Sequence, residues 1–148
     1  RKGKDITIVA ISWMNVEALK AAEVLKKTGI DVEIIDPRTI SPFDDELIVQ
    51  SVNKTGRCII VDNDWIFCGF SAEIAAIISE KCYGKLKFPI QRIGFAHTPC
   101  PSTRPLEDCF YPNAIDIIRT AEKIFKLKPM DLSKEKFYNY ENKFKGPF

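Results

Sequence analysis

The sequence lacks the features on which most recognisable catalytic sites depend. Its only histidine is His97, so a site that needs two histidines is excluded. The backbone cradles for dinucleotides (G-x-G-x-x-G) and nucleotide phosphates (G-x-x-x-x-G-K-[ST]) do not occur, nor does a G-x-S-x-G nucleophile elbow. We therefore expect no catalytic residue, no cofactor-binding residue and no metal ligand in this chain.

Long apolar runs and a strong charge bias are also lacking. No run of about 20 apolar residues occurs, so no membrane span is expected. The 22 basic and 20 acidic residues leave a net charge of +2, which does not indicate nucleic acid or a membrane as a partner. The 148 residues, 45% of them hydrophobic, suffice for one domain with a core of its own.

The cysteines are irregularly spaced. The five cysteines are odd in number and include no C-x-x-C pair, so neither a disulfide framework nor a zinc site is expected. We interpret them as reduced, buried thiols in a protein of the cytoplasm or of a mitochondrial or other organelle matrix. They are Cys58, Cys68, Cys82, Cys100 and Cys109.

Strand-like and helix-like segments alternate along the chain. Residues 6–11 are apolar at both odd and even positions, as in a parallel strand with helices on both faces. Further strands are predicted at 32–36, 57–62 and 89–94, and helices at 15–28, 44–55, 69–82 and from 113 onward. This order predicts an α/β fold, a three-layer α/β/α sandwich with a mostly parallel sheet.

Single residues predict where the helices begin, end and face the core. Asn15, Asp44 and Asn113 are expected to cap the starts of three helices, and Gly56 is expected to end the second. Leu47 is expected on the inner side of that second helix.

Two of the segments have distinct expected positions. The helix at 69–82 is apolar almost all round, which predicts the most buried helix. The segment 89–94 alternates apolar and polar residues after a proline, which favours the sheet edge. A proline-rich loop is expected at 97–105.

The character of the sequence changes after Lys126. Residues 1–126 form the predicted domain, and residues 127–148 form a tail rich in lysine and aromatic residues. The tail is expected either to be disordered or to pack on a parent assembly through Phe137, Tyr138, Tyr140 and Phe144. Its acidic residues disfavour binding to single-stranded nucleic acid. Because the chain begins with Arg1 and not with methionine, we expect a fragment or a processed product.

Candidate contact residues follow the predicted strands, because ligands of such sheets bind beyond the carboxyl ends of the strands. Free amides at 69–72 could hold an anion near Ser71 and Arg38, or Gly69 only permits a tight turn and Arg38 only pairs with Asp36. Contact with another subunit, or packing in the core, is expected for Trp65, Gly69 and Phe70. His97 is a candidate for contact with a partner or ligand, or an ordinary loop residue.

Three blocks of sequence are distinctive: VEIIDPRTISPFD at 32–44, KTGR at 54–57 and GFSAEI at 69–74. They resemble, in order and spacing, segments of the transketolase C-terminal domain family, most closely those of the β subunits of 2-oxoacid (pyruvate or branched-chain) dehydrogenases. The resemblance covers about residues 3–125. It implies a transketolase C-terminal domain-like fold.

The resemblance also implies a role. The intact enzyme would bind thiamine diphosphate and Mg²⁺ outside this domain, decarboxylate a 2-oxoacid and pass the acyl group to a lipoyl arm. The domain would serve assembly, with the α subunit, a second β subunit and the acyltransferase core as partners, and would be inactive alone. The alternatives are the matching domain of a transketolase, a deoxyxylulose-phosphate synthase or a 2-oxoacid:ferredoxin oxidoreductase, and a free-standing anion-binding module.

Overall fold

The structure, a computed structural model, describes residues 1–135 and 137. Strands and helices alternate as predicted. In chain order the elements are β1 (Ile6–Ala10), α1 (Met14–Lys26), β2 (Val32–Ile35), α2 (Asp45–Thr55), β3 (Cys58–Trp65), α3 (Phe70–Lys81), β4 (Gln91–Phe95), α4 (Arg104–Phe110) and α5 (Ala114–Phe125).

The four strands form one parallel sheet in the order β2-β1-β3-β4. Ile8 is paired with Ile34 on one side and Ile59 on the other, which fixes the register of the central strands. β4 lies at the edge, as the segment 89–94 predicted. The connection after β1 leads to β2 on one side and the connection after β3 leads to β4 on the other, so the sheet has its topological switch point between β1 and β3.

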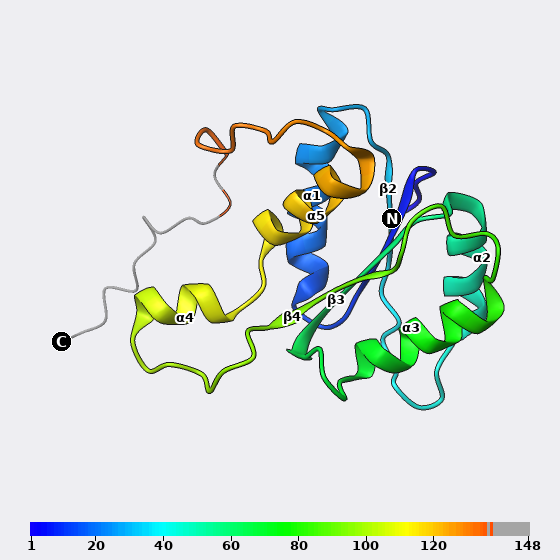
Figure 1. Cartoon of the computed structure of the whole chain (residues 1–148), viewed down its shortest axis with the longest axis horizontal. Coiled ribbons are helices and arrows are strands. Elements are labelled where there is room, and N and C mark those ends of the chain that lie inside the picture. The colour runs from blue at the N-terminus through cyan, green and yellow to red at the C-terminus, as the bar shows by residue number, and fades with distance from the viewer. Residues whose placement is uncertain (136, 138–148) are drawn as a thin grey trace.

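Helices cover both faces of the sheet, which confirms the three-layer prediction (Figure 1). Ile6, Ile8 and Ala10 contribute to the core beneath α1 and α5, whereas Val9 contributes to the core beneath α2 and α3. A strand with two buried faces must be apolar at successive positions, and this explains the composition of β1.

Local signals placed several helix ends correctly. Asp44 accepts a bond from the Leu47 amide at the start of α2, and Gly56 ends that helix at φ 72°, a left-handed conformation that glycine adopts without strain. Asn113 and Asp116 form a reciprocal capping box at the start of α5.

Two single-residue predictions were wrong. Asn15 does not cap α1: the helix already begins at Met14, and the Asn15 amide donates to the Ala10 and Ser12 carbonyls at 2.9 and 3.1 Å. Leu47 is exposed, because α2 turns Ile48 and the residues three and four positions further on toward the sheet.

The predictions for α3 and for the loop at 97–105 also need correction. α3 buries only Ser71, Ile74 and Ile78, fewer residues than α1 or α5, because it packs on β3 and α2 at one side of the sheet. The end of the predicted loop instead forms the start of the short helix α4, which has a proline in its first turn, a position that proline tolerates well.

The cysteines divide into two groups. Cys58 and Cys82 are buried beneath α2 and α3, where burial raises the pKa of each thiol. The prediction of burial was wrong for the other three, Cys68, Cys100 and Cys109, which lie in exposed loops or on α4.

Part of the predicted tail packs on the domain. The side chains of Met130, Leu132 and Phe137 lie against the core beneath α1 and α5. The remaining aromatic residues named for the tail, Tyr138, Tyr140 and Phe144, lie outside the described residues. The boundary at Lys126 stays a prediction.

Candidate functional site

The carboxyl edge of the sheet holds the predicted contact residues, and hollows open there, two of which are lined by those residues. The first, of about 430 Å³, lies beyond β1 and β2. Arg38 and Phe70 line it together with Ser12 and Asn15. It is next to the switch point, where sheets of this kind bind ligands.

Polar groups of the first hollow are bound to one another. The Arg38 Nε lies 3.5 Å from the Asp36 carboxylate, and the Arg38 amide donates to that carboxylate at 3.1 Å, so the loop ion pair considered from the sequence is present. The Arg38 side chain is 84% exposed, and such a surface pair contributes little to stability. Phe70 packs edge-to-face on Phe43, with ring centroids 5.1 Å apart.

The carboxylate of Asp62 accepts a hydrogen bond at the start of α3. Asp62, 5% exposed, accepts bonds from the amides of Asn63 and Ser71. Burial raises the pKa of the Asp62 carboxyl, the nearby Asp64 charge raises it further, and the two amide bonds act in the opposite direction. The Ser71 amide, a candidate for an external anion, therefore already serves an internal one.

Gly69 is required by space and not by its backbone angles. It precedes α3 at φ −79° and ψ 167°, values open to any residue. A Cβ there would lie 2.0 Å from the Trp65 carbonyl oxygen. This close approach folds the chain back between the end of β3 and the start of α3.

The second hollow, of about 570 Å³, lies beyond β3 and β4. Trp65, Phe67, Arg92 and His97 line it, and Arg92 donates to the Ile66 carbonyl at 2.8 Å. The register between β3 and β4 is irregular between Val61 and Trp65, after which Trp65 pairs with Phe95 at the end of both strands.

An aromatic cluster borders this hollow and consists of Trp65, Phe95, Phe110 and Tyr111. The Phe95 ring stacks on Phe110 at 4.8 Å between centroids and meets Trp65 edge-to-face at 5.5 Å. Trp65 is nevertheless 43% exposed, and its neighbour Phe67 is 76% exposed. Apolar rings held in fixed positions at the surface are typical of contacts with another protein.

The six predicted residues do not form one site. Arg38 and Phe70 border the first hollow, Trp65 and His97 border the second, and Gly69 and Ser71 lie at the start of α3. Sequence reasoning missed the exposed Trp13, Ile40 and Phe67. The signal available for them was a large apolar residue in each segment that follows a strand.

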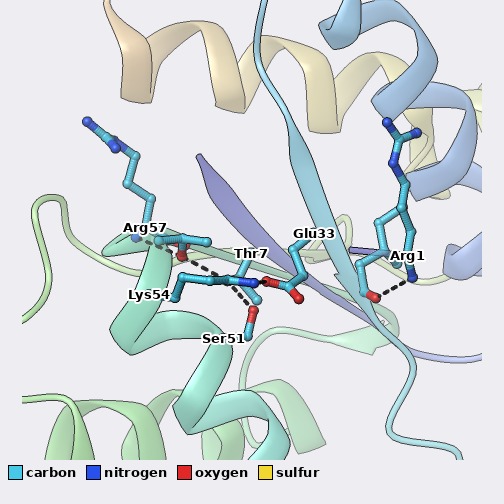
Figure 2. Close-up of polar contacts among 8 residues, drawn as sticks. Arg1, Thr7, Glu33, Ser51, Lys54 and Arg57 are labelled. Carbon is cyan, nitrogen blue, oxygen red and sulfur yellow. Dashed lines mark hydrogen bonds and ion pairs between the residues drawn. The ribbon is translucent and has the colours of Figure 1, made fainter. Parts of the chain in front are cut away.

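A buried polar cluster lies away from the carboxyl edge, beneath α2, and no sequence pattern singled it out. Figure 2 shows the Thr7 and Ser51 hydroxyls facing each other, and their oxygens are 2.7 Å apart. The Thr7 hydroxyl also lies 2.8 Å from that of Thr55, and Lys54 pairs with the largely buried Glu33. These residues line neither hollow, so their role is to join α2 to the sheet.

The chemistry offered by the carboxyl edge is that of contact. Among residues 1–135 and 137, no three His, Cys, Asp or Glu side chains come together as metal ligands. In the same part of the chain, no helix combines the length and apolarity needed to cross a membrane. What the edge does present is apolar surface beyond three of its strands.

Comparison with known proteins gives consistent relatives. The chain is 40% identical over 126 residues to the β subunit of acetoin:2,6-dichlorophenolindophenol oxidoreductase of Cupriavidus necator, covering 85% of this chain and 37% of that protein. It is 42% identical over 123 residues to the mitochondrial pyruvate dehydrogenase E1 component subunit beta of Pisum sativum, covering 83% and 34%. Both are β subunits, as the sequence blocks predicted.

A solved structure shows the same fold. It is described as a split-gene transketolase in an inactive β4 tetramer, and it matches with a TM-score of 0.75 and 30% identity, covering 87% of this chain and 42% of that one. This chain thus spans well under half the length of the relatives it matches. The model of the family described as transketolase, C-terminal domain, matches residues 1–117, and the chain belongs to that family.

Proposed function

We propose that this chain is the C-terminal assembly domain of the β subunit of a thiamine-diphosphate-dependent 2-oxoacid dehydrogenase. The observation that carries the proposal is the identity of about 40% to β subunits, one of them named as a pyruvate dehydrogenase component. The carboxyl edge supports it, because the edge offers rigid apolar surface and no reactive constellation.

The residues that the structure describes do not fit the cofactor of such an enzyme. A diphosphate needs free backbone amides or cations, yet the Ser71 amide is bonded to Asp62 and the Arg38 side chain is paired with Asp36. A Mg²⁺ ion needs converging oxygen ligands, and the described residues offer no acidic group of that kind. Thiamine diphosphate and Mg²⁺ would therefore be held by the rest of the longer protein, and the isolated domain would be inactive.

Assembly would use the burial of aromatic surface at the carboxyl edge. An aromatic side chain buries about 150–250 Å² and contributes roughly 25 cal/mol for each Å² removed from water. Trp65 is already oriented by the aromatic cluster, so little conformational entropy is lost on binding. The proposed partners are the α subunit, a second β subunit and the acyltransferase core.

The cellular compartment of the protein would be the one in which the assembled enzyme works. The Pisum sativum and Dictyostelium discoideum relatives are named as mitochondrial, and others come from bacteria such as Rickettsia felis. The proposed location is correspondingly a mitochondrial matrix or a bacterial cytoplasm.

The test is purification of the native gene product from its source. We expect a chain much longer at its N-terminus, an accompanying α subunit, bound thiamine diphosphate, and acylation of a lipoyl domain by a 2-oxoacid. Acetoin as the preferred substrate would move the protein toward the Cupriavidus necator relative. A native chain that starts near Arg1 and purifies alone would contradict the proposal.

Two other functions are alternatives that experiments on the purified protein distinguish. The solved structure described as a transketolase favours transketolase activity as the first of them, shown by activity without lipoyl acylation. The second is a free-standing anion-binding module near Arg38 and Ser71. Calorimetry with phosphate and carboxylates distinguishes it, and no heat of binding at millimolar concentration would remove it.

A further inference from the structure

The main chain of Met130 is held by two side chains of α5. The Glu122 carboxylate accepts the Met130 amide at 2.7 Å, and an Arg119 guanidinium nitrogen donates to the Met130 carbonyl at 3.1 Å. Arg119 also donates to both Glu122 oxygens, at 3.0 and 2.9 Å. The Arg119–Glu122 ion pair thus binds both the amide and the carbonyl of Met130, a residue that lies beyond the end of α5.

Burial makes this arrangement strong. Glu122 is only 3% exposed, and its carboxylate is compensated by Arg119 and by the Met130 amide. Removing a partner from a buried charge is far more costly than removing one from a surface pair. The contact of Glu122 and Arg119 with Met130 is therefore a specific interaction and not an incidental surface bond.

The segment around Met130 runs across α5 toward α1 (Figure 1, orange). We call residues 127–135 together with Phe137 the C-terminal strap. The Met130, Leu132 and Phe137 side chains pack on the core, and Lys27, directly after α1, pairs with Glu135 at 2.5 Å. The strap thereby covers apolar surface that α1 and α5 share.

We propose that Arg119 and Glu122 form a latch that binds the main chain of Met130, and that the C-terminal strap opens and closes on it as one unit. The strap has no strand in the sheet, so opening breaks the latch and the strap's apolar contacts but no sheet hydrogen bond. Opening exposes the α1–α5 surface, and closing makes the strap part of the folding domain.

Hydrogen exchange on the full 148-residue chain tests this, with Met130→Pro compared against Met130→Leu. The proline removes the amide that Glu122 binds and leaves α5 unchanged, whereas leucine keeps the amide and an apolar side chain. We expect the Ser133 and Glu135 amides to exchange at least about tenfold faster in Met130→Pro, the effect of losing one hydrogen bond to a charged group. Amides of β1 and β3 should stay protected to the same degree.

A second measurement uses cleavage after Lys134 by a lysine-specific protease. Glu122→Gln should speed that cleavage by about tenfold, and Lys123→Gln, at an exposed position on the same helix, should leave it unchanged. Strap amides that exchange at free-peptide rates in the unmodified chain would overturn the proposal. Equal exchange in the two Met130 variants, or equal acceleration in the strap and in β3, would overturn it as well.

Discussion

Two opposing effects act on the pKa of the Asp62 carboxyl. It lies within the strand β3, directly after Val61, and its carboxylate accepts bonds from the amides of Asn63 and Ser71 while burial disfavours its charge. Because burial is the larger effect, the folded protein raises the pKa of this carboxyl above its usual value. Its contribution to stability is then fully present below the usual pKa and is lost as the pH rises through the raised one.

Asp62→Asn is therefore expected to raise the melting temperature at pH 7. Asparagine has no charge, and its side-chain oxygen still accepts a hydrogen bond from a backbone amide. The gain should shrink toward zero as the pH falls below about 4, where an ordinary Asp carboxyl is protonated. Thermal unfolding between pH 3 and pH 8 measures it. A variant that is less stable at pH 7, or whose gain grows in acid, would show that the amide bonds outweigh burial.

Thr7 tests the polar cluster beneath α2. Thr7→Val keeps the shape of the side chain but removes the bonds to Ser51 and Thr55, which takes from the buried Ser51 hydroxyl the bond to Thr7 and leaves Thr55 bonded to Arg57. We expect a loss of about 1–3 kcal/mol in the free energy of unfolding, measured by urea denaturation. Ser79→Ala, which removes an exposed hydroxyl bond on α3, should change it by less than about 0.5 kcal/mol. Equal effects of the two changes would contradict the assignment.

Residue-level prediction from the sequence succeeded where the cause is local. Asp44, Asn113 and Gly56 act within their own helix turn, so their types reveal their roles. Asn15 failed because the strand end before it supplies the acceptors for its amide. Asp62 was not singled out because its partner Ser71 is nine residues away across a turn.

At the scale of elements, Glu17 joins α1 to α5. Its buried carboxylate accepts the Ala114 amide at 3.0 Å, at the positive end of the α5 dipole, and also pairs with Lys20 at 2.7 Å. Glu17→Ala is expected to cost about 2–3 kcal/mol of unfolding free energy. Glu23→Ala removes an exposed glutamate from the same helix and should cost less than about 1 kcal/mol, by the same denaturation measurement. A Glu17→Ala cost no larger than that of the control would contradict the coupling.

The order of strands and helices was predictable because β1 and the first residues of β3 are apolar at successive positions, and α2 and α5 carry their own capping residues. The burial of α3 was not, since an apolar composition does not say how many neighbours a helix has. The short helix α4 lacks an apolar face long enough to recognise. The packing of Met130 depends on Glu122, whose role appears only once α5 is folded.

At the scale of the whole molecule, the sheet has two unlike ends. The carboxyl end carries the first and second hollows, the aromatic cluster and the exposed Trp65 and Phe67. The region of the candidate site was predictable, because ligand contacts in parallel sheets gather at that end. Its division into separate hollows was not, since it depends on the register irregularity between β3 and β4 and on the return of the chain at Gly69.

The most direct test of an assembly role changes Phe67 in the complete protein and measures the affinity between its subunits by analytical ultracentrifugation. Phe67→Ser removes the most exposed ring at the second hollow, and Tyr83→Ser is the matched control, since Tyr83 is 91% exposed but follows α3, which ends away from the carboxyl edge. We predict that Phe67→Ser weakens association by at least about tenfold while Tyr83→Ser leaves it unchanged. Association of Phe67→Ser at the affinity of the unmodified protein would contradict the assignment of the carboxyl edge as the assembly surface.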